Sequence, residues 1–455
     1  MEVVSSVLNW FSSNILQNPA FFVGLLVLIG YALLKKPAHD VFSGFVKATV
    51  GYMLLNVGAG GLVTTFRPIL AALNYKFQIG AAVIDPYFGL AAANNKIAAE
   101  FPDFVGTATT ALLIGFGINI LLVALRKITK VRTLFITGHI MVQQAATVSL
   151  MVLFLVPQLR NAYGTAAIGH QQQFAIWFVD KVAGRFGKKE ESLDNLKLPK
   201  FLSIFHDTVV ASATLMLVFF GAILLILGPD IMSNKEVITS GTLFNPAKQD
   251  FFMYIIQTAF TFSVYLFVLM QGVRMFVSEL TNAFQGISNK LLPGSFPAVD
   301  VAASYGFGSP NAVLSGFTFG LIGQLITIVL LIVFKNPILI ITGFVPVFFD
   351  NAAIAVYADK RGGWKAAVIL SFISGVLQVA LGALCVALLD LASYGGYHGN
   401  IDFEFPWLGF GYIFKYLGIV GYVLVCLFLL VIPQLQFAKA KDKEKYYNGE
   451  VQEEA

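Results

Sequence analysis

The sequence predicts an all-α polytopic membrane protein, and three observations support this prediction. Of its 455 residues, 57% are hydrophobic and only 12% are charged, whereas an average soluble domain carries roughly 25% charged residues. Apolar stretches recur along the chain, and several approach or exceed the ~20 residues that cross a ~30 Å hydrocarbon core. Basic residues gather in the short segments between these stretches. Because lipid offers no partner to unpaired backbone groups, the apolar stretches are expected to be helices.

Seven apolar stretches are the clearest candidates for spanning helices. With shorter and interrupted segments included, we expect about ten or eleven transmembrane helices plus re-entrant hairpins. The chain begins without a basic region before its first apolar run, so no cleaved signal peptide is expected. The seven stretches are residues 21–34, 105–125, 135–156, 209–227, 314–334, 366–389 and 408–432.

A long hydrophilic stretch at residues 184–200 divides the chain into comparable halves. Lys and Arg cluster in this stretch, in other short loops and near the C-terminus, which places those segments in the cytoplasm. The loop at residues 392–407 has no Lys or Arg, which places it on the opposite side. The expected organisation is a first transmembrane repeat at 1–183, a cytoplasmic connector at 184–207, a second transmembrane repeat at 208–390, an extracytoplasmic loop and final transmembrane helix at 391–434, and a cytoplasmic tail at 435–455.

The two halves contain short segments that resemble each other. FITG at residues 135–138 is similar to IITG at 340–343. Upstream, GYML at 51–54 leads to AVID at 82–85, while GVRM at 272–275 leads to AVD at 298–300. Each half thus carries an acidic residue before a Thr-Gly turn. This pattern is typical of an inverted-repeat transporter, in which discontinuous helices meet near the bilayer midplane.

The charge pattern also indicates that a helix is missing. The basic loop at 126–132 and the connector should lie on the same side, so an even number of crossings must join them. Only one clear spanning stretch, 135–156, lies between them. Residues 169–182 are polar at their start and short, which favours a re-entrant hairpin. The charge pattern therefore indicates that a spanning helix is absent between Val156 and Gly169.

Two polar clusters interrupt the apolar sequence and predict a ligand site. GHQQQF at residues 169–174 and TGHIMVQQ at 137–144 each combine a glycine, an imidazole and glutamines. Such groups suit recognition of a polyhydroxylated ligand, because amides and imidazoles both donate and accept hydrogen bonds. Gln143 lies four residues after His139 on one helix face, while Gln144 turns away.

Several further residues allow both a ligand-binding and a structural interpretation. Asp300 lies among Pro and Gly residues and either accepts a ligand hydroxyl, couples a charge, or caps a broken helix. Asp85-Pro86-Tyr87 either stacks an aromatic face on a sugar-like ring or ends a half-helix. His206-Asp207 is better read as a helix cap, and Asn351 either joins helices or binds ligand.

The sequence offers little support for catalysis, metal binding or nucleic-acid binding. Cys385 and Cys426 lie in apolar stretches, where a thiol behaves as a small hydrophobe, so neither a disulfide nor a cysteine metal site is expected. The glycine cluster at 58–61 is not followed by Lys-Ser or Lys-Thr, so it favours helix packing over phosphate binding. We expect no catalytic residue, no cofactor, no metal site and no nucleic-acid partner.

The motifs carry a resemblance to a known family. The chain resembles the ascorbate-specific membrane component, IIC, of the bacterial phosphoenolpyruvate-dependent phosphotransferase system. The resemblance covers nearly the whole chain and rests on GYMLL at 51–55, LFITGHIM at 134–141, GHQQQF at 169–174, KKEES at 188–192, LKLP at 196–199 and QGVRMFV at 271–277.

The resemblance implies a homodimer in the bacterial inner membrane, with a cytoplasmic C-terminus and two inverted repeats that form core and scaffold domains. It implies inward transport of L-ascorbate by movement of the core, coupled to phosphorylation by a soluble IIB phosphocarrier with IIA upstream. Membrane lipid would surround the protein. The implied substrate-binding residues are Pro86, Tyr87, His139, Ile140, Met141, Val142, Gln143, His170, Gln171 and Asp300.

The chain departs from the family pattern at two places. Proline at position 86 removes a possible side-chain and backbone donor. About 25 to 30 residues, one spanning helix and its loop, are missing between Val156 and Gly169. Two other functions remain open: an ion-coupled secondary transporter that uses Asp300 and the histidines, and a membrane-embedded enzyme or receptor.

Overall fold

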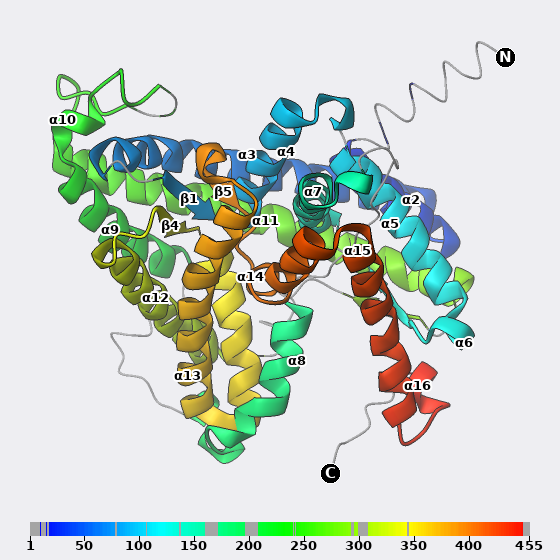
Figure 1. Cartoon of the computed structure of the whole chain (residues 1–455). Helices are drawn as coiled ribbons and strands as arrows, with labels where there is room; N and C mark the ends of the chain where they lie inside the picture. The colour runs from blue at the N-terminus through cyan, green and yellow to red at the C-terminus, as the bar shows by residue number, and fades with distance from the viewer. Residues whose placement is uncertain are drawn as a thin grey trace.

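A computed structural model of the chain shows a predominantly helical protein (Figure 1). The structure describes residues 18–77, 80–105, 107–135, 138–159, 172–195, 208–239, 243–292, 295–298, 308–343 and 345–448, together with residues 10, 15 and 241. The position at which a helix is predicted to be missing, between Val156 and Gly169, lies mostly within residues 160–171, which are outside the described residues.

The described elements alternate long helices with very short strands. The helices are α2 (Pro19–Leu33), α3 (Ala38–Phe77), α4 (Pro86–Glu100), α5 (Thr107–Ala124), α6 (Arg126–Thr129), α7 (Gly138–Leu155), α8 (Gln173–Val182), α9 (Thr208–Leu227), α10 (Pro229–Met232), α11 (Phe251–Leu291), α12 (Pro310–Val333), α13 (Asn351–Leu388), α14 (Ile401–Glu404), α15 (Pro406–Lys439) and α16 (Lys445–Asn448). The strands are β1 (Gly80–Ile84), β2 (Thr133–Phe135), β3 (Phe296–Ala298), β4 (Ile338–Thr342) and β5 (Gly396–Tyr397). A π-helical segment, η9 (Val345–Asp350), precedes α13, and 3-10 turns are η2 (Pro102–Phe104), η3 (Pro157–Leu159), η4 (Ala183–Arg185), η5 (Lys189–Glu191), η6 (Leu193–Asn195) and η10 (Ala392–Tyr394).

One bundle contains α2, α3, α9 and α11, with α10 at its edge. The long helices α3 and α11 approach closely at Gly51 and Gly272: a Cβ on Gly272 would lie 2.5 Å from the Gly51 carbonyl oxygen. These two glycines begin the GYML and GVRM segments that resemble each other. Segments that are similar in sequence thus meet in space, which supports the predicted repeat.

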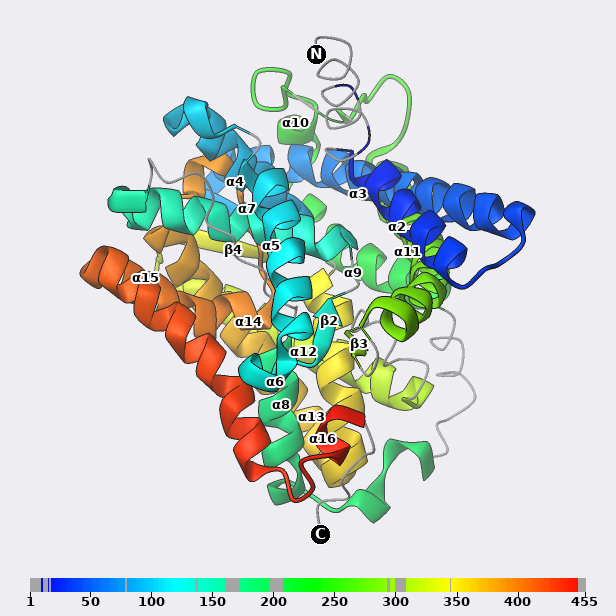
Figure 2. The same ribbon diagram turned by 90° about the vertical axis from the view of Figure 1, so that its right-hand side faces the viewer.

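The second bundle contains α4, α7, α8 and α12–α15, and it lies beside the first (Figure 2). Helix α13 consists of two antiparallel arms, because its backbone leaves helical geometry at Gly363, where φ is +65°. The arms pack so closely that the Asn351 amide donates to Gln378 Oε1 over 3.1 Å. This contact confirms that Asn351 joins helices, one of the two interpretations of that residue.

A small parallel sheet separates the two bundles. Strand β1 lies between β4 and β5, and Ile84 pairs with Thr342. Because side chains alternate across a strand, Ala81 and Val83 pack into the apolar core of the first bundle, while Ala82 and Ile84 pack into that of the second. The sheet therefore holds the helix that follows β1 at the boundary between the bundles.

The strands connect the two halves of the chain. Strand β1 of the first half pairs with β4 of the second, and β2 of the first half pairs with β3 of the second. All four strands lie in or beside the similar segments AVID, IITG, FITG and AVD. The pairing of strands from one half with strands from the other fits an internal repeat. The inverted topology of that repeat stays a prediction.

Four helical segments of the described residues are long and apolar enough to cross a membrane. They are 38–77, 311–333, 345–388 and 401–439, and shorter apolar helices occur at 20–33, 143–155, 216–227 and 251–265. The chain is therefore a helical membrane protein with several apolar helices. The predicted total of ten or eleven crossings stays a prediction, as do the domain boundaries drawn from the charge pattern.

Candidate functional site

The start of α4 contains two of the predicted site residues, Pro86 and Tyr87, and both are buried. Asp85 Oδ1 accepts a hydrogen bond from the Tyr87 backbone N–H over 3.0 Å, as an N-cap residue does. Asp85 Oδ2 accepts from the Val345 backbone N–H over 3.1 Å. A single carboxylate thus caps the helical segments that follow β1 and β4, one from each half of the chain.

The Asp85 side chain lies against the backbone of Gly343, and this explains how it reaches both α4 and the segment that follows β4. A Cβ on Gly343 would lie 2.3 Å from the Asp85 Cβ, closer than two carbon atoms can approach. The residue after β4 is therefore a glycine, opposite the capping acid that follows β1. The sequence allowed Asp85-Pro86-Tyr87 to end a half-helix, whereas in the structure these residues begin one, α4. The structure does not test contact of Tyr87 with a ligand.

Gln143 lies in α7 and is buried, and its Oε1 has no hydrogen-bond partner among the described residues. One turn further on, Thr147 Oγ1 donates to the Gln143 carbonyl over 3.0 Å and lies 3.3 Å from His398 Nδ1. His398 is fully buried, and its Nε2 also has no described partner. Buried amide and imidazole groups without partners are costly, so this region has unused hydrogen-bonding capacity.

His398 is neutral at physiological pH. Burial lowers the pKa of its imidazole from 6.5 to about 3, although a hydrogen bond with the Gln143 backbone acts in the opposite direction. A neutral imidazole has one nitrogen that donates and one that accepts. His398 can therefore complement hydroxyl groups, but it does not change its charge in the range in which an ordinary histidine titrates.

We expect this burial to make the protein sensitive to acid. Unfolding restores an ordinary imidazole pKa, so below pH 6.5 His398 binds a proton in the unfolded chain but stays neutral in the folded protein. The free energy of unfolding therefore falls as the pH drops towards 3. Relative to His398→Gln, the wild-type protein should lose roughly 3 kcal/mol more between pH 7 and pH 4. Denaturant unfolding in detergent at both pH values measures this difference; equal losses would contradict it.

A second buried polar cluster surrounds Asp350 at the start of α13. The Asn400 amide donates to Asp350 Oδ1 and Oδ2 over 2.6 and 2.7 Å, and the Ile401 backbone N–H donates to Oδ2 over 3.3 Å. Gln378 donates to the same oxygen over 3.3 Å. These donors satisfy a fully buried carboxylate, which would otherwise be strongly unfavourable in the protein interior.

The start of α8 is held by a residue far along the chain. Asp402 Oδ2 and Oδ1 accept hydrogen bonds from the backbone N–H groups of Phe174 and Ala175, each over 2.9 Å. Gln172, immediately before α8, has a φ of +64°, and its own side chain does not cap the helix. Both polar atoms of the buried Gln172 amide lack a partner among the described residues.

The structure describes only part of the predicted site. The side chains of Pro86, Tyr87 and Gln143 are described and buried. Four residues lie in the first turns of α7 but have no described side chains: His139, Ile140, Met141 and Val142. His170, Gln171 and Asp300 lie outside the described residues, as does His206-Asp207. Among the described residues, no group of three or more His, Cys, Asp or Glu residues could hold a metal ion.

Sequence reasoning missed the contribution of the segment at 396–404, which the charge pattern assigned to an extracytoplasmic loop. All nine of its residues are buried. Its composition gave one signal: His398, Asn400, Asp402 and Glu404 recur every second residue beside apolar neighbours. The absence of Lys and Arg, taken as a sign of membrane side, also fits a segment that is buried inside the protein.

Comparison with known proteins identifies the family of the chain. A family model described as the sugar-specific permease component of the phosphotransferase system, EIIC-GAT, matches residues 14–162 and 154–415. The two ranges meet at the position where the sequence predicts a missing helix. A protein of Mycoplasma pneumoniae named the ascorbate-specific phosphotransferase EIIC component is 33% identical over 426 residues, covering 80% of this chain. The chain spans 64% of the length of that relative.

The family match extends over most of the chain and includes the strand-to-helix segments at β1, β2, β3 and β4. The chain therefore belongs to the family of sugar-specific permease components of the phosphotransferase system, EIIC-GAT.

Proposed function

We propose that this protein is the membrane permease subunit that binds L-ascorbate and moves it inward, coupled to phosphorylation of the ascorbate by a phosphorylated IIB partner. The observation that carries the proposal is the 33% identity to a relative whose name states ascorbate specificity. The permease subunit is then not itself the enzyme, because the phosphoryl-donating residue lies on the partner.

The chemistry around α4 and α7 supports a polyhydroxylated ligand. Gln143 and His398 provide buried hydrogen-bonding atoms without described partners, and Tyr87 provides a buried aromatic ring at the start of α4. Amides and neutral imidazoles complement hydroxyl groups, since each can donate and accept. The proposed substrate-binding residues remain Pro86, Tyr87, His139, Ile140, Met141, Val142, Gln143, His170, Gln171 and Asp300.

The surroundings of Cys385 support a separate phosphoryl donor. Cys385 is buried, and its thiol lies 3.7 Å from the Phe403 carbonyl. A reactive thiolate needs exposed, electropositive surroundings, and Cys385 has neither property. We therefore assign phosphoryl transfer to a soluble IIB phosphocarrier, with IIA upstream.

The proposal includes a homodimer in the bacterial inner membrane, surrounded by lipid, with a cytoplasmic C-terminus. The bundle of α2, α3, α9 and α11 would act as the scaffold, and the bundle of α4, α7, α12 and α13 would be the moving core. The residues of β1 and β4 that pack against the first bundle support this division, because Ala81, Val83, Leu339 and Ile341 have apolar side chains with no hydrogen bonds to break.

Uptake of labelled ascorbate distinguishes this function from the ion-coupled alternative. Cells that lack their own carrier would express this protein with the soluble partners present or withheld, and the internal product would be identified. We expect phosphorylated ascorbate inside only when the partners are present. Free ascorbate that accumulates with an ion gradient and without the partners would favour an ion-coupled transporter.

The proposed residues are tested by binding measurements. Gln143→Ala, Gln171→Ala and Asp300→Asn are each expected to weaken ascorbate binding about tenfold or more, because each removes hydrogen bonds to the ligand, worth roughly 1.5 kcal/mol. Gln434→Ala serves as the control, since Gln434 contacts the Ile128 carbonyl at the far end of α15. Unchanged affinity in all three variants, measured by calorimetry on folded protein, would rule out the assignment.

A further inference from the structure

We propose that the 396–404 segment is the element that positions the substrate site, and that Asp402 is its positioning residue for the start of α8. The inference rests on the proposed function, because it concerns the same site. It extends that function by assigning a role to a segment outside the proposed substrate-binding residues.

The first argument is burial. Every residue of the 396–404 segment is buried, although five of the nine carry polar or ionisable side chains: Tyr397, His398, Asn400, Asp402 and Glu404. Burial of polar groups is unfavourable unless they form hydrogen bonds. His398, Asn400 and Asp402 form specific polar contacts, and these contacts determine what the segment can position.

Its first residues hold the start of α4. The Asp85 backbone N–H donates to the Tyr397 carbonyl over 2.9 Å. A Cβ on Gly399 would lie 2.6 Å from Asp85 N, and one on Gly89 would lie 2.5 Å from His398 N. The segment thus packs directly against the turn that presents Pro86 and Tyr87, with no space for side chains between the two backbones.

The following polar residues each contact a different helix. His398 meets Thr147 on α7, one turn beyond Gln143. Asn400 binds both oxygens of Asp350 at the start of α13. The first half and the second half of the chain are therefore joined through neighbouring residues of one segment.

Asp402 completes the set by binding the start of α8. Its two oxygens accept from Phe174 N and Ala175 N, each over 2.9 Å, and its side chain is 1% exposed. Because α8 begins at Gln173, inside the GHQQQF motif, this cap fixes the position of the last residue of the motif, Phe174. Each oxygen is bound by a backbone donor of α8, so the role assigned to Asp402 is to position α8.

These contacts explain why the segment matters for binding. A ligand that is held by residues from α4, α7 and the region before α8 requires those elements at fixed separations. Misplacement of a binding group by about 1 Å can lower activity by ~100-fold. A single segment that contacts α4, α7, α8 and α13 fixes all of these separations together.

The experiment compares two capping aspartates. Asp402→Ala removes the cap of α8, and Asp250→Ala removes the corresponding cap of α11, where Asp250 Oδ1 accepts from Phe252 N and Met253 N over 2.8 and 3.3 Å. Both variants should show a comparable small fall in melting temperature. Only Asp402→Ala should also lose ascorbate affinity, by about tenfold or more, measured by calorimetry on the purified full chain.

Asp402→Asn provides a milder variant if Asp402→Ala does not fold. It keeps the side-chain volume and one accepting oxygen, so we expect an intermediate loss of affinity, about threefold. Unchanged affinity in the folded Asp402 variants, or an equal loss in Asp250→Ala, would overturn the inference. Failure of the wild-type protein to bind ascorbate would contradict the proposed function, and this inference with it.

Discussion

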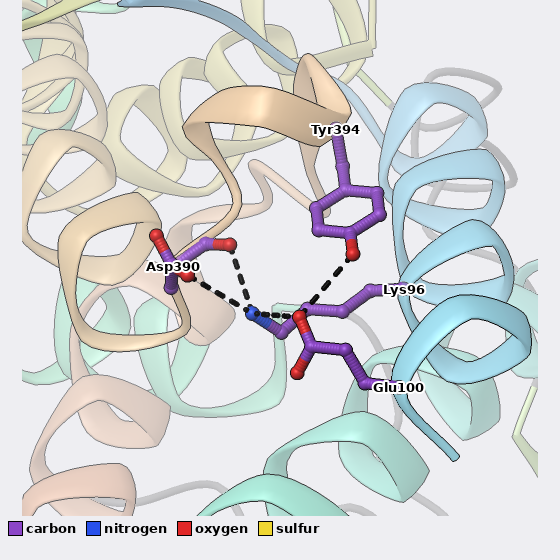
Figure 3. Close-up of polar contacts among 4 residues, drawn as sticks. All are labelled: Lys96, Glu100, Asp390 and Tyr394. Atoms are coloured by element: carbon purple, nitrogen blue, oxygen red, sulfur yellow. Dashed lines mark hydrogen bonds and ion pairs between the residues drawn. The ribbon is translucent and has the colours of Figure 1, made fainter.

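Removal of both carboxylates that face Lys96 is expected to lower the free energy of unfolding by about 3 kcal/mol. The Lys96 side chain is fully buried, and its Nζ lies 3.1 Å from Glu100 Oε1 and 3.5 Å from Asp390 Oδ2 (Figure 3). A buried ammonium group without a carboxylate keeps its desolvation cost and loses its compensation. The double variant Glu100→Gln/Asp390→Asn preserves shape, and denaturant unfolding measures the loss.

The expected loss is at the lower end of the range for buried ion pairs, because the carboxylates themselves are partly exposed. The side chains of Glu100 and Asp390 are 36% and 74% exposed. Lys96 also keeps other partners, since it donates to the Asp390 carbonyl over 3.0 Å and lies 4.2 Å from the centre of the Phe154 ring. These contacts keep the ammonium group in place when the carboxylates are neutralised.

The control is the same double change in a Lys96→Met background. Methionine fills a similar volume without charge, so the two carboxylates there have no buried partner to stabilise. We expect the double change to cost less than about 0.5 kcal/mol in that background, as surface substitutions usually do. Equal losses in both backgrounds would show that Glu100 and Asp390 act independently of Lys96.

The Lys96 cluster shows what sequence reasoning could not provide. The apolar stretches and the similar segments of the two halves predicted helices and a repeat. Asp85-Pro86-Tyr87 indicated the end of a half-helix as one of two interpretations, where the structure has the start of α4. Those predictions depend on local pattern alone. The partners of Lys96 come from Glu100, one helical turn away, and from Asp390, 294 residues along the chain. Only the second partner required the tertiary structure.

At the candidate site, too, the sequence pattern identified residues but not their partners from distant parts of the chain. The glycine, histidine and glutamine motifs identified Gln143 as a polar residue in an apolar helix, and the structure buries it with an unpartnered oxygen. The capping of Val345 by Asp85 depends on the pairing of β1 with β4. Charge counting treated residues 396–404 as a loop between spans, because it measures which side a segment occupies and not whether it is buried.

Replacement of Gly399 by alanine is expected to prevent correct folding of the site. Gly399 has a φ of +69°, which costs alanine roughly 1 to 2 kcal/mol. Its Cβ would also lie 2.4 Å from the Ile84 carbonyl carbon and 2.6 Å from Asp85 N, and these backbone atoms cannot move without breaking the sheet. We expect a total loss of more than about 4 kcal/mol and no ascorbate binding, measured by unfolding and calorimetry.

Gly395 provides a matched control, because it separates backbone strain from collision. Its φ is +71°, almost the same as that of Gly399, but nothing lies within 4 Å of a Cβ built on it. Gly395→Ala should therefore cost only the strain of roughly 1 to 2 kcal/mol and should keep ascorbate affinity. Similar losses in both variants would mean that strain alone determines the effect. A large difference would mean that contact between the 396–404 segment and the end of β1 holds Asp85, and with it the starts of both half-helices, in place.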